Sequence, residues 1–238
     1  NIVIDEDDAF AIATRELIAT NDFFKWIGND FESARIRMAE SKSMTASLTH
    51  LCSLESLYEY NITLLTTNSI VNNGWPDHRS GGSGGVVLKA YKTIRPPEEQ
   101  IQKYVKHLSI YWDAMLAVLP DLNISGHLMR NHACDPGNPE DETKDSALFW
   151  PVCQEILISL VRRLCDERLD SPDAPTLQKV KTAIQPLAEL NWNMHEVPWR
   201  HMALKNGPED LTKWAMRSED RKQVLRIVEA ILSWQLGL

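Results

Sequence analysis

The sequence predicts an all-α protein, an irregular multi-helix bundle with room for one short residual strand at its N-terminus. Apolar residues recur at steps of three and four over several long stretches, the pattern of a helix with one buried face. Carboxylates, serines and prolines stand just before these stretches, where helices begin. About 43% of the 238 residues are apolar, so the chain can bury a sizeable core without disulfides or metals.

The first part of the chain predicts a strand-like start and two helices. Residues 1–4 are β-like, and acidic residues follow them. Asp7 or Asp8 can cap the first helix, because a carboxylate accepts hydrogen bonds from its exposed N–H groups. One face of this helix carries Phe10, Ala13 and Leu17. Asp22 then precedes a second, short helix that ends near Gly28.

The central part predicts two long helices separated by a linker. The first carries an apolar stripe made of Met44, Leu48, Leu51, Tyr58, Ile62 and Leu65. A glycine-rich run near residues 79–86 is typical of a flexible linker, and no Gly-Lys-Ser/Thr follows it, which excludes a Walker A loop. The second helix begins at Pro96, Pro97 and two glutamates, and Pro120 ends it. Its stripe is Ile101, Tyr104, Leu108, Tyr111, Met115 and Leu119.

The last part predicts a polar loop over residues 126–145 and three further helices. Residues 146–168 form the first, with Phe149, Val152, Ile156, Leu160 and Leu164 inward. The second carries Leu177, Val180, Ile184 and Leu187 on one face and is kinked at Pro186. The third runs from a Ser218 cap to about Leu236. We expect it to bury Val224, Ile227 or Val228, and Ile231.

The whole chain, residues 1–238, is expected to form a single helical domain. It begins at Asn1 rather than Met and without a signal segment, so we expect that it either was trimmed or begins inside a longer protein. No apolar stretch is long enough for a membrane helix. Four cysteines lie far apart without any CxxC pair, which favours reduced thiols in the cytoplasm. We therefore expect a soluble, cytoplasmic protein.

Two basic groups are the candidate DNA-binding residues. Arg35, Arg37 and Lys42 lie among serines ahead of a predicted helix, where Arg and Ser side chains suit phosphate oxygens. Arg162 and Arg163 lie on the predicted polar face of their helix. A solvated face balanced by nearby acids is the alternative for both groups. Because the net charge is −8, any DNA contact has to come from such a local basic patch or from a part not present here.

No pattern predicts a cofactor, a metal or a catalytic residue. His127, His132, Cys134 and Asp135 share a polar loop, but their spacing fits none of the compact structural-zinc patterns. The carboxylate pairs lie at helix starts or in that loop, where capping and solvation account for them. Most of the eight tryptophans lie on or beside apolar helix faces. Trp192 and Trp199 are the exceptions that are candidates for stacking on bases.

Five blocks, in order, resemble the DGQHR-domain family of DNA sulfur-modification proteins. The first block is a basic, serine-rich turn and helix over residues 34–54, and the second is the Arg95-Pro96-Pro97 helix start that leads to Tyr111 and Trp112. The third block is the segment 148–157, and the fourth is Leu190-Asn191-Trp192 followed by Pro198-Trp199-Arg200. The fifth block is a closing helix with Arg221, Val224 and Ile227. The resemblance spans about residues 10–236 and implies that the chain is the C-terminal, helical part of a larger protein of this kind. The name-giving Asp-Gly-Gln-His-Arg motif and its α/β half are absent, and Trp150 stands where the family has a basic residue.

This resemblance implies a DNA-binding regulatory or accessory protein of a DNA-modification and phage-defence system, with DNA as partner. The helical part would act mainly as a scaffold or interaction part, and a second copy or other subunits of such a system are further possible partners. The alternative is a nucleotide-hydrolysing or DNA-nicking defence enzyme whose active site lies in the absent N-terminal half. A third interpretation is an interaction module that holds partner subunits through an apolar helix face.

Overall fold

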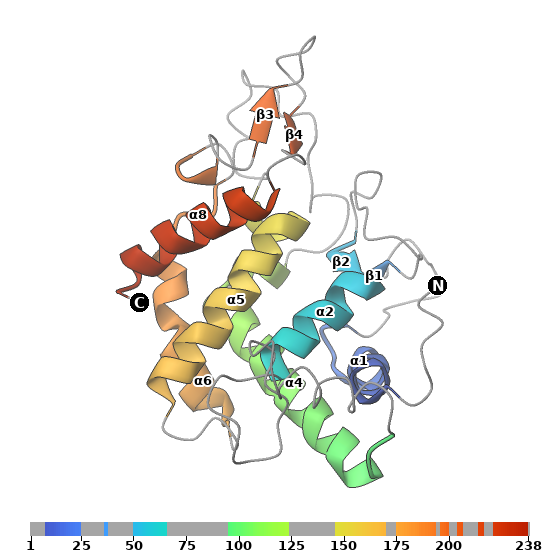
Figure 1. Cartoon of the computed structure of the whole chain (residues 1–238). Coiled ribbons are helices and arrows are strands. Elements are labelled where there is room, and N and C mark those ends of the chain that lie inside the picture. Colours follow the sequence, from blue (N-terminus) through green and yellow to red (C-terminus); the bar gives the residue numbers. More distant parts are fainter. Residues whose placement is uncertain are drawn as a thin grey trace, which may run out of the picture.

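Helices from the whole length of the chain pack around one apolar core, as the computed structural model shows (Figure 1). The structure describes residues 8–24, 36–37, 50–65, 95–123, 146–169, 175–193, 196–199, 204–206, 214–216 and 221–237. The main helices of these ranges are α1 (Ala9–Thr20), α2 (Leu54–Leu65), α4 (Glu98–Val118), α5 (Pro151–Arg168), α6 (Leu177–Ile184) and α8 (Arg221–Gln235). The predicted all-α class is confirmed.

Helix α1 begins where the sequence predicts it. Asp8 is the N-cap, and its Oδ1 accepts hydrogen bonds from the backbone N–H of Phe10 at 2.8 Å and of Ala11 at 3.0 Å. The predicted face of Phe10, Ala13 and Leu17 is fully buried. It packs against α4, where the ring of Phe10 stacks on that of Tyr104 at a centroid distance of 5.9 Å.

Helix α2 begins later than predicted. The apolar stripe predicts a helix from Met44, but β2 (Cys52–Ser53) precedes α2 and pairs in parallel with β1 (Ile36–Arg37). The buried Ser53 accepts a hydrogen bond from the N–H of Ser56 at 3.1 Å and so caps the helix. The spacing of apolar residues predicted a helix here, but Cys52 and Ser53 pair as a strand instead.

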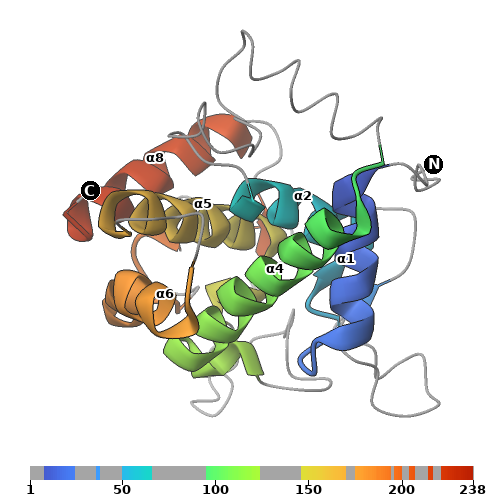
Figure 2. The same cartoon turned by 90° about the horizontal axis from the view of Figure 1, so that it is seen from below.

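Helix α4 crosses the middle of the molecule and contacts α1, α2 and α6 (Figure 2). Its predicted stripe from Ile101 to Met115 is buried, Leu119 is its C-cap, and the short 3-10 helix η2 (Pro120–Asn123) follows. The start and the end predicted from the flanking prolines are both confirmed. Proline at the first turn and glutamates beside it stabilise the start, and a proline cannot continue the last turn.

The predicted helix over residues 146–168 is divided into two parts. A 3-10 helix, η3 (Ala147–Phe149), ends at Trp150, and α5 starts at Pro151. Phe149, Ile156, Leu160 and Leu164 are buried as predicted. The amide of Gln154 donates to the carbonyls of Leu148 at 2.9 Å and Leu51 at 3.1 Å, so this turn is held against the segment before α2.

Helix α6 ends at Ile184, and the 3-10 helix η4 (Gln185–Glu189) follows it at Pro186, where the sequence predicts a kink. Leu177 is 43% exposed, so the prediction that it faces inward is wrong. It is the first residue of the helix. A second strand pair, β3 (Leu204–Asn206) and β4 (Trp214–Met216), is antiparallel and was not predicted.

Helix α8 packs on α5 along one side (Figure 1). Val228, Leu232 and Leu236 are buried there, and Ile231 is half-buried. Of the two alternatives for its inner face, Val228 is confirmed and Ile227, which is 40% exposed, is wrong. Both residues are apolar neighbours on the helix, so only the position of α5 decides which one is covered.

Several predictions lie outside the described residues: the strand over residues 1–4, the second short helix beyond Phe24, the side chain of Val224, the glycine-rich linker near 79–86 and the polar loop 126–145. Within the described ranges, Phe23 and Phe24 are buried against the ring of Trp112, with centroid distances of 6.4 and 5.0 Å. None of the helices in these ranges combines the length and the apolar character that crossing a membrane requires.

Candidate nucleic-acid interface

The first predicted basic group is only partly within the described chain. Strand β1 contains Arg37, whose backbone pairs with Ser53 of β2. Arg35 and Lys42 lie outside the described residues, as does the side chain of Arg37. The strand pair therefore holds the backbone of residues 36–37 beside Ser53, the residue that precedes α2.

The start of α2 has the polarity that suits an anion, with one of its donors already used. A helix N-terminus carries a partial positive charge and N–H groups without intrahelical partners. Ser53 satisfies the N–H of Ser56, and its hydroxyl donates to Ser56 Oγ at 3.0 Å. His50 is half-buried at the edge of this turn. Phosphate oxygens that approach here would meet the positive end of the α2 dipole.

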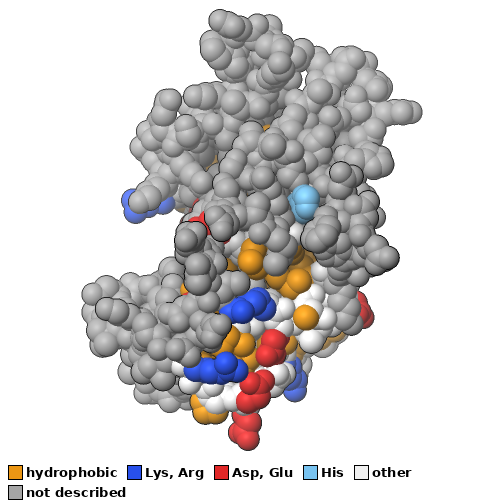
Figure 3. All heavy atoms as spheres, turned by 90° about the vertical axis from the view of Figure 1, so that its right-hand side faces the viewer, with side chains coloured by type: hydrophobic (Ala, Val, Ile, Leu, Met, Phe, Trp, Pro, Cys, Tyr) orange, Lys and Arg blue, Asp and Glu red, His pale blue; other side chains and the backbone are white. Residues whose placement is uncertain are grey.

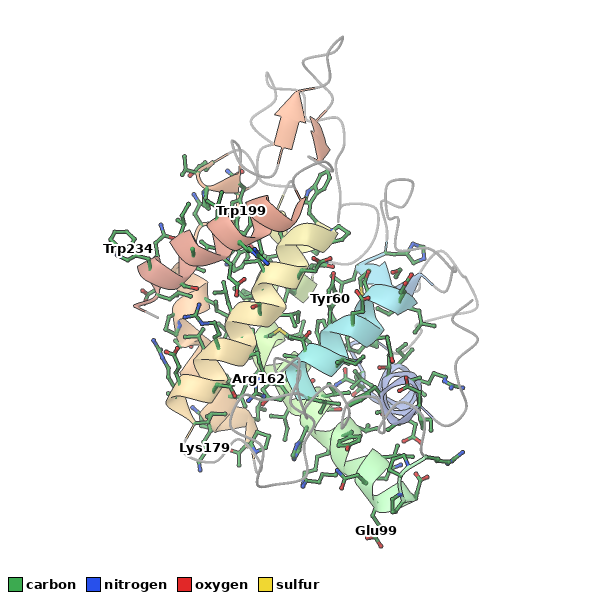
Figure 4. All side chains as sticks on the ribbon, in the orientation of Figure 1. Tyr60, Glu99, Arg162, Lys179, Trp199 and Trp234 are labelled. Atoms are coloured by element: carbon green, nitrogen blue, oxygen red, sulfur yellow. The ribbon has the colours of Figure 1, made fainter. Side chains whose placement is uncertain are left out.

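Arg162, in the second predicted basic group, is not on a polar face. It is 2% exposed, and its Nη1 donates to Tyr111 Oη at 2.8 Å and to the carbonyl of Leu64 at 3.0 Å. Its Nε donates to Asp166 Oδ1 at 3.1 Å, and its Nη2 forms an ion pair with the same oxygen. Figure 4 shows Arg162 between α5 and α2. The prediction of a solvated face is wrong here, because the guanidinium has its partners inside the protein.

Burial changes the acid–base properties of this cluster. It raises the pKa of Cys165 to about 12, although the charge of Arg162 acts in the opposite direction. Burial likewise raises the pKa of Tyr111 to about 12. The pKa of Arg162 is raised in spite of its burial, because Tyr111 and Asp166 favour the charged form. The thiol therefore stays protonated at neutral pH, so it lacks the thiolate that a nucleophile needs.

Arg163 connects two helices. Its Nη1 donates to Ser233 Oγ at 2.8 Å, and its Nη2 lies 3.9 Å from Glu167 Oε1. One turn earlier, Ser159 donates to Glu229 Oε1 at 2.6 Å. The side chain of Arg163 is 31% exposed, so it reaches solvent only in part. These bonds form a polar seam between α5 and α8, and the arrangement accounts for Arg163 without a ligand.

Trp192 and Trp199 stack on each other rather than presenting their faces to solvent. Their ring centroids are 5.5 Å apart, and Trp199 is fully buried. Trp192 Nε1 donates to the carbonyl of Leu187 at 3.0 Å, and Trp199 Nε1 donates to that of Asn191 at 2.6 Å. The indole groups are thus part of the core, and the prediction that they are free to stack on bases is wrong for both.

The structure exposes an aromatic residue that the sequence did not single out. Trp234 is 81% exposed at the end of α8, and Figure 4 shows it pointing away from the molecule. Trp234 comes seven residues after Ile227, so the two lie on the same side of a helix. This spacing was the sequence signal that could have singled out Trp234.

Charge on the described surface is mixed. Figure 3 shows Lys and Arg side chains lying among Asp and Glu side chains on the described part of one face, without a continuous basic surface there. Within the described ranges, no group of three His, Cys, Asp or Glu side chains is arranged to hold a metal ion. The predicted candidates for a zinc loop, residues 126–145, lie outside these ranges.

Comparison with known proteins gives no family. No protein-family model, no curated protein and no solved structure matches this chain.

Proposed function

We propose that this chain is the helical accessory part of a DNA-binding regulatory protein in a DNA-modification system, and that it contacts the DNA backbone through Arg35, Arg37 and Lys42. The observation that supports this most is the pairing of Arg37 with Ser53, which holds the backbone of residues 36–37 beside the residue that precedes α2. The resemblance of five sequence blocks to the DGQHR-domain family supplies the class of system.

The α5 arginines are not part of this proposal. Arg162 donates hydrogen bonds to Asp166, to Tyr111 and to the carbonyl of Leu64, and Arg163 donates one to Ser233. Moving either guanidinium to a phosphate would leave polar partners of these helices unsatisfied, at about 1–3 kcal/mol for each buried group. The first basic group is the one that carries the proposed contact.

A cytoplasmic location follows from the proposed role and agrees with the cysteines. Cys52, Cys153 and Cys165 are buried thiols. Because the whole chain has a net charge of −8, contact with DNA is confined to a local patch, and its affinity is low and steeply dependent on salt.

The test is DNA binding by the whole chain as a function of salt. We expect a variant with Arg35, Arg37 and Lys42 replaced by Gln to bind more weakly. Its plot of log K against log salt should be flatter by about two to three, since each neutralised phosphate contact contributes about 0.9 to the slope. Fluorescence anisotropy of a labelled duplex at several salt concentrations measures both quantities.

The matched control replaces Lys103, Lys106 and Lys179 by Gln. These lysines are exposed on α4 and α6, so the control has the same change in net charge at another place. It should leave the slope unchanged. An equal slope for both triple variants would remove the Arg35 segment from the interface and contradict the proposed function.

A further inference from the structure

A buried side-chain amide joins the start of α5 to the segment before β2. Gln154 lies at the first turn of α5 and is 4% exposed. Its Nε2 donates to the carbonyl of Leu51 at 3.1 Å and to that of Leu148 at 2.9 Å. A carbonyl can only accept, so these two partners determine which end of the amide carries the N–H groups. Both N–H groups of the side chain are therefore used inside the protein.

The oxygen of the same amide faces α2. Tyr60 Oη lies 3.2 Å from Gln154 Oε1 and 3.1 Å from the carbonyl oxygen of Pro151, and both are acceptors within reach of its one proton. Figure 4 shows Tyr60 between α2 and α5. The ring of Tyr60 is buried, at 3% exposure. Gln154 thus connects three parts of the fold to α5: the segment before β2, the 3-10 helix η3, and α2.

The break between η3 and α5 explains why a side chain is needed here. In a 3-10 helix the carbonyl of residue 148 accepts a hydrogen bond from the N–H of residue 151. Residue 151 is Pro151, which has no N–H. The amide of Gln154 supplies a donor to this carbonyl, and its second N–H group binds the carbonyl of Leu51. One side chain therefore completes a local turn and joins two segments that are 103 positions apart.

The strand pair next to this contact is short. β1 and β2 contain two residues each, and a two-stranded pair in isolation is at most marginally stable. Leu51, Cys52 and Ser53 are nevertheless buried, at 0–1% exposure. A pair of this size keeps its place through its contacts with the rest of the protein, and the bond from Gln154 to the carbonyl of Leu51 is one of them.

We propose that Gln154 is a positioning residue that holds β2 beside α5 and, through the pairing of Arg37 with Ser53, also holds the backbone of β1. Without the amide, the strand pair opens locally while the helices stay folded. For its DNA part this inference rests on the proposed function, since Arg37 belongs to the proposed contact. A released segment keeps its cations, so it binds the same number of phosphates but has to be ordered on binding, which lowers the affinity.

Thiol labelling tests the restraint, because a buried cysteine reacts only when its surroundings open. Cys52 lies in β2 and Cys165 near the end of α5, and both are fully buried. The whole chain is labelled with N-ethylmaleimide under native conditions, and mass spectrometry of the digested protein gives the rate at each cysteine. We expect Gln154→Met to raise the rate at Cys52 about tenfold relative to Cys165, since the carbonyl of Leu51 loses this donor. An equal change at both cysteines, or none at Cys52, would overturn the inference.

The matched control is Asn61→Leu. Asn61 is also a buried amide, but it connects α2 with Thr14 of α1 and Trp112 of α4. Its loss should change the rates at both cysteines by the same factor. A selective increase at Cys52 in this control would overturn the inference, because Cys52 would then report any loosening of the core.

Tyr60→Phe is the second variant, in case Gln154→Met does not fold. It keeps both N–H bonds of the amide and removes only the hydroxyl that faces Gln154 Oε1. We expect it to raise the rate at Cys52 about twofold to threefold relative to Cys165. An unchanged ratio in this folded variant would overturn the inference as well.

DNA binding separates this inference from the proposed function. In the anisotropy experiment Gln154→Met should lower the affinity by about threefold to tenfold at an unchanged salt slope, whereas the Arg35, Arg37 and Lys42 variant flattens the slope. Added to that triple variant, Gln154→Met should have no further effect. A triple variant with an unchanged slope refutes the proposed function, and the labelling ratio then decides the restraint. A triple variant that binds weakly beside a Gln154→Met chain that binds normally refutes the positioning role.

Discussion

His107 shows how the surroundings of a single residue set its charge in this protein. It lies on α4 and is 7% exposed. Burial, together with the smaller effect of the charges of Lys103 and Lys106, lowers its pKa from 6.5 to about 4. The imidazole is therefore neutral at physiological pH, and it takes up a proton much more readily in the unfolded chain.

This difference predicts a loss of stability in mild acid. Above pH 6.5 both states of the chain hold His107 neutral, and its titration contributes nothing. Between pH 6.5 and 4 the unfolded chain binds a proton that the folded chain does not, so the free energy of unfolding falls, by up to about 2–3 kcal/mol. A His107→Gln variant, followed by urea unfolding at several pH values, should lack this part of the decrease. Parallel curves for the two proteins would contradict the prediction.

At the scale of the element, one carboxylate joins a helix cap to a tertiary contact. Asp8 accepts two N–H bonds at the start of α1 through Oδ1, and its Oδ2 accepts a hydrogen bond from Tyr58 Oη of α2 at 2.5 Å. Asp8 is itself buried, at 7% exposure. The start of α1 is thereby fixed to α2 as well as to its own first turn.

Replacing this cap should destabilise the fold by more than an ordinary cap does. We expect Asp8→Ala to lower the free energy of unfolding by about 2–3 kcal/mol, since it removes the cap and leaves the Tyr58 hydroxyl without this acceptor. Tyr58→Phe removes only the second contact and should lower it by about 1 kcal/mol. Urea denaturation of both variants separates the two contributions. Equal losses would show that the cap itself contributes little.

Helix α8 shows why the sequence does not tell which face of a helix is buried. Its inner face carries the polar seam of Glu229 and Ser233 with α5 beside its buried leucines. Its outer face has apolar side chains only partly covered. Propensity and periodicity identify this helix, but they give both faces nearly the same character.

At the scale of the whole molecule, buried polar side chains connect segments that are far apart in the sequence. Asn61 of α2 donates to Thr14 of α1 at 2.9 Å and accepts from Trp112 of α4 at 3.0 Å. Arg162 of α5 donates to Tyr111 of α4 and to the carbonyl of Leu64 at the end of α2, so it connects these three helices. Because each bond requires its partners to be in place together, these residues favour one arrangement of the helices.

Removing the charge of Arg162 should therefore affect global stability strongly. We expect Arg162→Met to lower the free energy of unfolding by about 3–5 kcal/mol, because Asp166 is left almost buried without its partner. Arg162→Met combined with Asp166→Leu should recover much of that loss. Arg163→Met, at a partly exposed site on the same helix, should lose only about 1 kcal/mol. Similar losses for the two single variants, measured by urea denaturation, would contradict this account.

Predictions from the sequence were best where a local signal decides the structure. The cap at Asp8, the proline-glutamate start of α4, its end before Pro120 and the break at Pro186 are all where the sequence predicts them. Each depends on residues within one or two turns. The start of α2 was wrong because strand pairing with residues 36–37, some fifteen positions away, replaces the helix there.

The candidate site was less predictable. Arg162 and Arg163 are adjacent, and nothing local shows that one is buried against Tyr111 while the other reaches the seam with α8. The same holds for Trp199, which is fully buried, and Trp234, which is 81% exposed. An arginine or a tryptophan is compatible with either environment, since both combine apolar surface with a polar group.

The sequence by itself determined that this protein is helical and where several of its helices begin and end. Hydrogen bonds within a helix and the preferences of its terminal residues are properties of neighbours along the chain, so the sequence contains them. Only the tertiary structure decided which face of each helix is covered, that Arg162 is a core residue and that Trp234 is exposed. Burial is a property of neighbours in space, and it follows from how all the helices pack together.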